Sequence, residues 1–264
     1  MADGSGAPVL QQRTTIFVYV PAFGDMVSTT TSLSILELST ALNRADIPAA
    51  VTMVSNPELS ESRNMATTLW YDSIKTTHML MVDADMGFAP DLVLDMLAVN
   101  EPLVGTLYRK KRDDAVLWAG SGFPMDGNLS ERAGKQLHPG RSNFLAVEAV
   151  GMGVTLIRRD CITAMLEQEK AFSDPHIHGH CPQDVELQQR GARRLIRCFD
   201  PIYISGRGRL SEDLSFCYRH RACGGHVWAA IGHDVTHIGK KAYAGSFLDH
   251  QLQIEALTKA ETVQ

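Results

Sequence analysis

The segment HMLMVDAD, residues 78–85, is the strongest indication of the fold class in this chain. Its first five residues form a short apolar run, which predicts a buried β-strand. The run leads directly into two aspartates that are separated by one residue. In open α/β sheets, ligands bind at the carboxyl ends of the strands. We therefore expect Asp83 and Asp85 to lie in a ligand-binding loop.

Strand and helix patterns alternate on both sides of this stretch. Apolar, β-branched runs predict further strands at Thr15–Val20, Ala49–Val54 and Pro102–Leu107. Helical spacing of apolar residues predicts helices over Ser28–Arg44, Leu59–Ile74 and Pro90–Val99. This alternation predicts an α/β fold with a mostly parallel central sheet flanked by helices.

The second half of the chain has a looser pattern. Strands are expected at Phe144–Val150, Gly153–Ile157 and His226–Ala230, a strand pair at Ile196–Ile204, and helices over Asp160–Lys170 and Ser211–Gly224. Phe172–Gly191 is expected to be irregular. We divide the chain into a disordered lead-in (1–13), one domain (14–244) and a C-terminal helix or tail (245–264).

Composition narrows the classes of protein. The 264 residues are 44% hydrophobic and carry a net charge of −5, so a general attraction to nucleic acid is not expected. No apolar run reaches the roughly 18 residues of a transmembrane helix. Met1–Gln12 lacks the order of a signal peptide. The five cysteines are scattered without a C-x-x-C pair, which is typical of reduced thiols in a cytoplasmic protein.

The two aspartates suggest the chemistry of the loop. Hard divalent cations such as Mn²⁺ or Mg²⁺ prefer oxygen ligands and often retain water and substrate phosphates. A cation bound at Asp83 and Asp85 would neutralise a diphosphate. An isolated D-x-D pattern more often reflects one aspartate that caps the next helix and another that faces solvent, so the motif alone does not establish a metal site.

Three other segments carry polar groups that suit such a site. Arg63 and Asn64 lie near a predicted helix start, where a cation and an amide can meet phosphate or a nucleobase. Glu212 and Asp213 lie at another predicted helix start, where they either favour the helix dipole or supply a general base. His237 follows a strand-like segment, where it is either structural or a metal ligand.

Three blocks of the sequence together resemble a known family. Residues 63–97 (RNMATTLWYDSIKTTHMLMVDADMGFAPDLVLDML), 150–160 (VGMGVTLIRRD) and 211–239 (SEDLSFCYRHRACGGHVWAAIGHDVTHIG) are similar to GT-A glycosyltransferases related to family 2. Their order and spacing agree with that family over roughly residues 15–240. The resemblance implies a GT-A fold and a UDP or GDP sugar as donor. It also implies a carbohydrate acceptor and a single catalytic domain over 14–244, with 14–107 as the nucleotide-sugar-binding half and 108–244 as the acceptor-binding half.

The resemblance also implies roles for individual residues. Asp85 and His237 would bind the metal, and Asp83 would reach the ribose, the metal or a metal-bound water. Glu212 and Asp213 would be the catalytic carboxylates, with Asp213 as the general base if the reaction inverts the anomeric centre. The implied donor-binding residues are Pro21, Ala22, Phe23, Arg63, Asn64, Asp83, Ala84, Asp85, Tyr108 and Lys110.

Two departures from the family pattern bear on specificity. The acid that usually follows the second strand is replaced by Val54-Ser55-Asn56-Pro57, so the nucleobase is not assigned. The Q-x-x-R-W motif of processive synthases is absent, which favours the transfer of a single sugar.

The apolar spacing in Phe247–Thr258 predicts a helix that packs on the domain or on a second copy, as in a homodimer.

Alternative functions remain open at this point. His176, His178, His180 and Cys181 offer ligands for zinc, as in a zinc-dependent hydrolase, although no H-E-x-x-H helix accompanies them. A nucleotidyltransferase also places acids near an α/β sheet, but Val20–Gly24 is a poor match to its glycine-rich phosphate loop. A non-catalytic binding module of the same fold is the third alternative.

Overall fold

The computed structural model describes residues 13–56, 58–74, 76–123, 136–175, 182–206 and 208–262. The histidine-rich cluster His176, His178, His180 and Cys181 lies outside the described residues, as do residues 1–12. Within the described part, none of the helices is both long and apolar enough to span a membrane.

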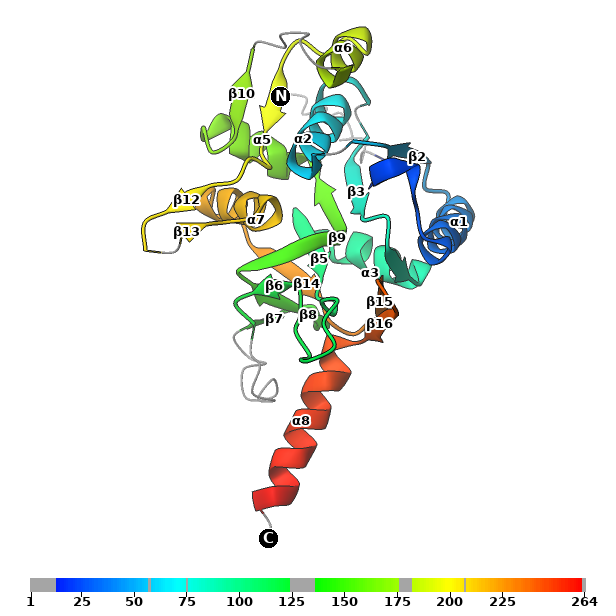
Figure 1. Cartoon of the computed structure of the whole chain (residues 1–264), viewed down its shortest axis with the longest axis vertical. Helices are drawn as coiled ribbons and strands as arrows, with labels where there is room; N and C mark the ends of the chain where they lie inside the picture. The colour runs from blue at the N-terminus through cyan, green and yellow to red at the C-terminus, as the bar shows by residue number, and fades with distance from the viewer. Residues whose placement is uncertain are drawn as a thin grey trace, which may run out of the picture.

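A nine-stranded sheet forms the centre of the described structure (Figure 1). Its strands are β1 (Ile16–Pro21), β2 (Ala49–Val54), β3 (His78–Val82), β5 (Leu103–Thr106), β6 (Gly120–Ser121), β7 (Leu137–His138), β8 (Arg141–Val147), β9 (Ala149–Arg158) and β14 (Val227–Ala230). The order is β2-β1-β3-β9-β5-β14-β8-β7, and β6 also pairs with β9. The four strands predicted in the first half are therefore present as β2, β1, β3 and β5.

Most strands of the sheet share one direction, as the alternation predicts. β2, β1 and β3 are mutually parallel, and β5 is parallel to β14. Strand β9, however, lies between β3 and β5 and runs antiparallel to both. It reaches this place only after the chain has passed through residues 107–148, so the sheet is mixed. Because β9 is buried along nearly its whole length, it forms the middle of the core.

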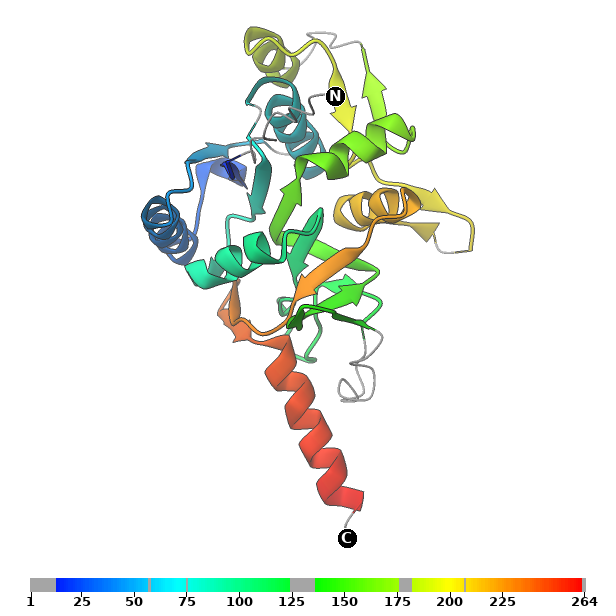
Figure 2. The ribbon, with the colours of Figure 1, turned by 180° about the vertical axis from the view of Figure 1, so that it is seen from behind.

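Helices cover both faces of the sheet (Figures 1 and 2). The helices on one face are α2 (Leu59–Leu69), α5 (Arg159–Glu167) and α7 (Glu212–Ala222), and those on the other are α1 (Thr29–Arg44) and α3 (Pro90–Val99). Side chains alternate along a strand. Thus Tyr19 and Met81 join the apolar cluster with α2, α5 and α7, whereas Val20 and Val82 join the cluster with α1 and α3. The result is a three-layer α/β/α core.

Smaller elements complete the described structure. They are the short helices η1 (Phe23–Asp25) and η2 (Trp70–Ile74), helix α6 (Pro182–Gln189), and strands β4 (Met86–Phe88), β10 (Phe172–Asp174), β11 (Leu195–Arg197), β12 (Tyr203–Ile204), β13 (Gly208–Arg209), β15 (Val235–Ile238) and β16 (Ala242–Gly245). The helix expected over Leu59–Ile74 thus ends in one wider turn, η2. The segment expected to be irregular contains β10 and α6, whose weak apolar patterns the sequence does not reveal.

The chain ends in helix α8 (Phe247–Thr262), which agrees with the helix predicted there. Figure 1 shows α8 extending away from the body of the molecule. Phe247 at its start is fully buried, and its ring lies edge-on to Trp118 with 5.3 Å between the ring centroids. Leu252 and Leu257 farther along are exposed. The first turn is therefore anchored in the core.

Strand β3 begins with a buried histidine, His78. Its Nδ1 lies 2.9 Å from Thr77 Oγ1, and its buried Nε2 has no hydrogen-bond partner among the described residues. The pKa of His78 is lowered to about 4, mainly by burial of the imidazole and to a smaller extent by the nearby charge of Arg158. The imidazole is therefore neutral in the folded protein near neutral pH.

Because His78 is buried and neutral, we expect the folded protein to lose stability in mild acid. Below pH 6.5 the unfolded chain binds a proton at His78 that the folded chain does not, so stability falls as pH falls toward 4. At about 1.4 kcal/mol per pH unit, the free energy of unfolding should decrease by about 2 kcal/mol between pH 7 and pH 5 on account of His78. Urea unfolding at both pH values should show that His78→Gln loses this component. The exposed-site control His226→Gln should retain it, and equal pH dependence in the two variants would contradict the assignment.

Candidate functional site

The Asp83-Ala84-Asp85 turn at the carboxyl end of β3 is held by backbone hydrogen bonds on both sides. The Asp83 N–H donates to Gly153 O of β9 at 2.9 Å. The Ile238 N–H at the end of β15 donates to Asp85 O at 2.7 Å. The side chains of Asp83 and Asp85 stay 25% and 37% exposed. The turn therefore presents two carboxylates on a rigid backbone at the edge where parallel strands end.

Arg63 of α2 is buried directly behind Asp83. Its side chain is 2% exposed and donates to Asp83 Oδ1 at 2.7 Å and to Glu212 Oε1 at 2.8 Å. Burial alone lowers the pKa of Arg63, but the charges of Asp83 and Glu212 outweigh it and raise the pKa above its ordinary value. The guanidinium is therefore a permanent charge that joins α2, the end of β3 and the start of α7.

Asp85 faces a histidine and a lysine. His237 Nε2 lies 3.5 Å from Asp85 Oδ1, and Lys111 Nζ donates to Asp85 Oδ2. His237 Nδ1 lies 2.9 Å from Arg109 O, and only a protonated nitrogen can hydrogen-bond to a carbonyl. In the neutral imidazole the lone pair is then on Nε2, which faces Asp85. Metal-binding histidines are commonly oriented by this kind of bond.

The Tyr108 ring packs against the His237 ring. The two rings meet edge to face with 5.1 Å between their centroids, and Tyr108 is buried. A Cβ at Gly151 would lie 2.4 Å from the Tyr108 hydroxyl, and one at Gly153 would lie 2.6 Å from its ring. The two glycines of the VGMGV stretch thus leave room for this tyrosine. Burial, followed by the charge of Asp83, raises the pKa of Tyr108, so its hydroxyl stays protonated.

The two acids at the start of α7 have different surroundings. Glu212 accepts the hydrogen bond from Arg63, whereas Asp213 Oδ1 accepts from the Ser211 hydroxyl and from the Leu214 N–H at 2.7 Å. No ion pair of Asp213 occurs among the described residues. Only Asp213 of the two therefore has a carboxylate without a cationic partner there.

The other residues expected at the donor site lie in three places. Pro21 ends β1, Ala22 is buried with its N–H on Val54 O at 2.8 Å, and Phe23 is 66% exposed. Asn64 is buried: its amide donates to Asp200 and its carbonyl accepts from the Phe199 N–H. Ala84 is half-buried in the turn. Lys110, which precedes Lys111 in the sequence, is exposed. Asn64 thus connects α2 to the segment before β12.

Sequence reasoning missed Lys111. The basic run Arg109–Arg112 after β5 was visible in the sequence, but nothing in it distinguishes the lysine that reaches Asp85 from the one that faces solvent.

The side chains at this site supply part of a coordination shell for a divalent cation. Among the described residues, no group of three or more His, Cys, Asp or Glu side chains is arranged to hold a metal. Asp85 and His237 form a pair, with one oxygen and one nitrogen donor facing each other. Magnesium commonly takes only one or two protein carboxylates and completes its shell with water and substrate phosphates. The pair fits a metal that is bound together with a phosphorylated ligand.

Comparisons with known proteins add two structural similarities, while no family model and no curated protein matches. The crystal structure of A197 from STIV has a TM-score of 0.46 at 15% identity and covers 89% of this chain and 90% of that chain. A Drosophila beta-1,4-galactosyltransferase 7 mutant, solved with manganese, UDP-Gal and xylobiose, has a TM-score of 0.30 at 14% identity. That match covers 67% of this chain and 60% of the other. At these scores the likeness assigns no role to any residue here.

The Arg63 bridge predicts a large stability effect. Arg63→Met should lower the free energy of unfolding by roughly 3 kcal/mol, because it leaves the Asp83 and Glu212 carboxylates without their cation. Adding Glu212→Gln should recover part of the loss by removing one of the two charges. Chemical denaturation measures both effects. Arg112→Met, which removes an exposed pair with Asp114, is the control and should leave the free energy of unfolding nearly unchanged, because solvent screens exposed ion pairs; equal losses for the two arginines would refute the bridge.

Proposed function

We propose that this chain is a metal-dependent glycosyltransferase with a GT-A fold. It moves a single sugar from a nucleoside-diphosphate sugar of the UDP or GDP type to a hydroxyl of a saccharide or glycoconjugate. The observation that carries the proposal is the facing pair of Asp85 Oδ1 and His237 Nε2, 3.5 Å apart, at the carboxyl end of the parallel strands. The Arg109 carbonyl fixes the imidazole so that its lone pair is on the nitrogen that faces Asp85.

Asp85 and His237 would hold Mn²⁺ or Mg²⁺ through one carboxylate and one imidazole. When bound, such a cation supplies positive charge that stabilises the departing diphosphate. Lys111 adds a second positive charge beside Asp85. With phosphate in the site, this lysine can donate to a phosphate oxygen instead of the carboxylate, because its four-carbon stem is flexible. Both features favour a polyanionic ligand over a neutral one.

Arg63 and Asp83 have a supporting role in this proposal. The guanidinium is 2% exposed and already donates to two carboxylates, so it stabilises the site from beneath. Asp83 is 25% exposed and would meet the ribose or a metal-bound water. The exposed Phe23 at the end of β1 provides an aromatic surface for the nucleobase. Tyr108 supports His237 from the core.

Asp213 is the proposed general base for an inverting reaction. The acceptor oxygen forms a bond to the anomeric carbon while the bond from that carbon to the diphosphate oxygen breaks, and the hydroxyl proton moves to the Asp213 carboxylate. Glu212 is less suited to this role because its carboxylate is bound to Arg63. It instead fixes the start of α7, and thereby the position of its neighbour Asp213.

Donor binding can be tested by calorimetry. UDP and GDP titrated into the protein with Mn²⁺ should show that one of them binds, and that omitting Mn²⁺ weakens binding by at least tenfold. Asp85→Asn and His237→Ala should each abolish the metal dependence, because each removes a protein ligand. Asp91→Asn, which changes an exposed carboxylate on α3, is the matched control and should bind as the wild type does. If neither nucleotide binds at saturating Mn²⁺, the transferase proposal fails.

Asp213 can be tested by the rate of transfer. With the selected donor and a panel of saccharides, Asp213→Asn should lower kcat by about 10²–10⁴-fold, the usual contribution of a general base. Calorimetric affinity for the nucleotide should stay within twofold, because the carboxylate contacts the acceptor and not the diphosphate. Glu212→Gln should mainly reduce stability through Arg63. A wild-type rate in Asp213→Asn, or a product with retained anomeric configuration, would exclude the base assignment.

A further inference from the structure

A hollow runs along one face of α7. Leu214, Tyr218 and Arg221 are spaced by four and three residues, so they share one face of the helix. The hollow has a volume of about 430 Å³ between Glu148, Ile204, Tyr218, Arg221 and Ala222. A smaller hollow of about 40 Å³ shares Glu148, Tyr218 and Arg221 with it and reaches Leu214. We call the joined hollows the α7 groove.

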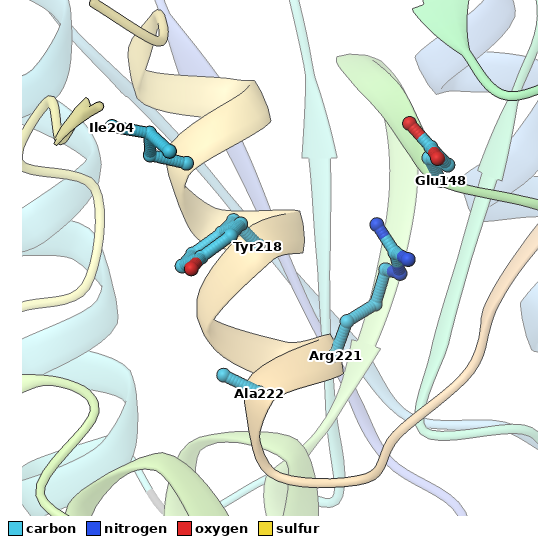
Figure 3. A pocket seen from close by; sticks show the side chains of 5 residues that line it. All are labelled: Glu148, Ile204, Tyr218, Arg221 and Ala222. Carbon is cyan, nitrogen blue, oxygen red and sulfur yellow. The ribbon is translucent and has the colours of Figure 1, made fainter. Parts of the chain in front are cut away.

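The α7 groove contains three polar side chains that have no partner among the described residues. Glu148, Arg221 and Tyr218 make no side-chain hydrogen bond or ion pair in the part of the chain that the structure describes. Figure 3 shows Arg221 extending toward Glu148, while the Tyr218 ring lies across α7 on the side of Ile204. A carboxylate, a guanidinium and a phenol that face the same hollow unpaired are available to a ligand.

The chemistry of the groove favours a neutral ligand with many hydroxyl groups. The carboxylate of Glu148 accepts hydrogen bonds, the guanidinium of Arg221 donates them, and their charges cancel. The Tyr218 ring, on a residue 41% exposed, offers an apolar face against which a sugar ring can pack. A phosphate backbone would be repelled by Glu148, and a wholly apolar ligand would leave both charges without hydrogen bonds. A saccharide uses all three groups.

The α7 groove reaches Leu214, which follows Asp213 in the sequence, and extends from there along the helix. At a rise of 1.5 Å per residue, Tyr218 and Arg221 lie about 8 Å and 12 Å from Asp213 along the α7 axis. On the opposite wall, Glu148 is five residues before Gly153, whose carbonyl binds the Asp83 N–H. At about 3.3 Å per residue, that is about 16 Å along the extended chain. A ligand that spans this distance is longer than one sugar ring.

We infer that the α7 groove binds the acceptor, and that the acceptor is a neutral oligosaccharide whose terminal residue lies at Asp213 while the preceding residues contact Tyr218, Glu148 and Arg221. This inference rests on the proposed function for the identity of the transfer site. It adds the class and the minimum length of the acceptor. It also assigns binding roles to residues that lie outside the donor site.

The test measures saccharide binding separately from nucleotide binding. The probes are maltotetraose, cellotetraose and chitotetraose, each paired with its monosaccharide, titrated calorimetrically into the full chain without nucleotide. At least one tetrasaccharide should bind the wild type at least tenfold more tightly than its monosaccharide does. Tyr218→Ala should weaken that binding about tenfold through loss of the ring contact. Glu148→Gln, which keeps the size of the side chain, should weaken it severalfold.

Controls separate this inference from the proposed function. Phe172→Ala removes an exposed aromatic ring on β10, away from the groove residues, and should leave saccharide binding unchanged. Tyr218→Ala should bind nucleotide and Mn²⁺ as the wild type does. Tetrasaccharide binding that is absent, or is equal in the wild type and Tyr218→Ala, overturns the inference even where nucleotide binding is intact. Groove-dependent saccharide binding without any nucleotide binding supports the groove and removes the transferase.

Discussion

The candidate site depends on one buried charge, the Arg63 guanidinium. It donates to Asp83 at the end of β3 and to Glu212 at the start of α7, while only 2% of the side chain is exposed. Burying a guanidinium is costly unless carboxylates neutralise it. Two half-buried acids are equally unfavourable without a cation between them. The three groups therefore stabilise one another, and in doing so they place Asp213 on the same edge of the sheet as Asp85.

The antiparallel strand β9 is the second constraint on the site. It pairs with β3 up to Val82↔Val154 and then continues past the end of β3. Its Gly151 and Gly153 leave space for Tyr108, which packs against the His237 ring. Because β9 begins directly after Glu148 of the α7 groove, one strand connects the support of the metal-binding pair with the proposed acceptor site.

Prediction from sequence succeeded where the pattern is local. The apolar run before Asp83 forms a buried strand, and the helix starts near Arg63 and Glu212 exist, because period-2 and period-3.6 patterns depend on near neighbours. The interaction partners of these residues could not be predicted from local patterns. Arg63 was expected to reach the base or diphosphate, but in the structure it binds two carboxylates. Lys111, in a loop without periodicity, was not identified at all.

From sequence alone one can predict which strands and helices follow one another along the chain and that acids stand at the end of a buried strand. Which charges meet depends on the tertiary structure: Arg63 and Glu212 are 149 residues apart, and Lys111 and Asp85 are 26 apart. Such pairings follow from the order of strands in the sheet, above all from the insertion of β9 between β3 and β5. That order is set by the burial of both faces of the sheet at once, a property of the whole chain that no local pattern contains.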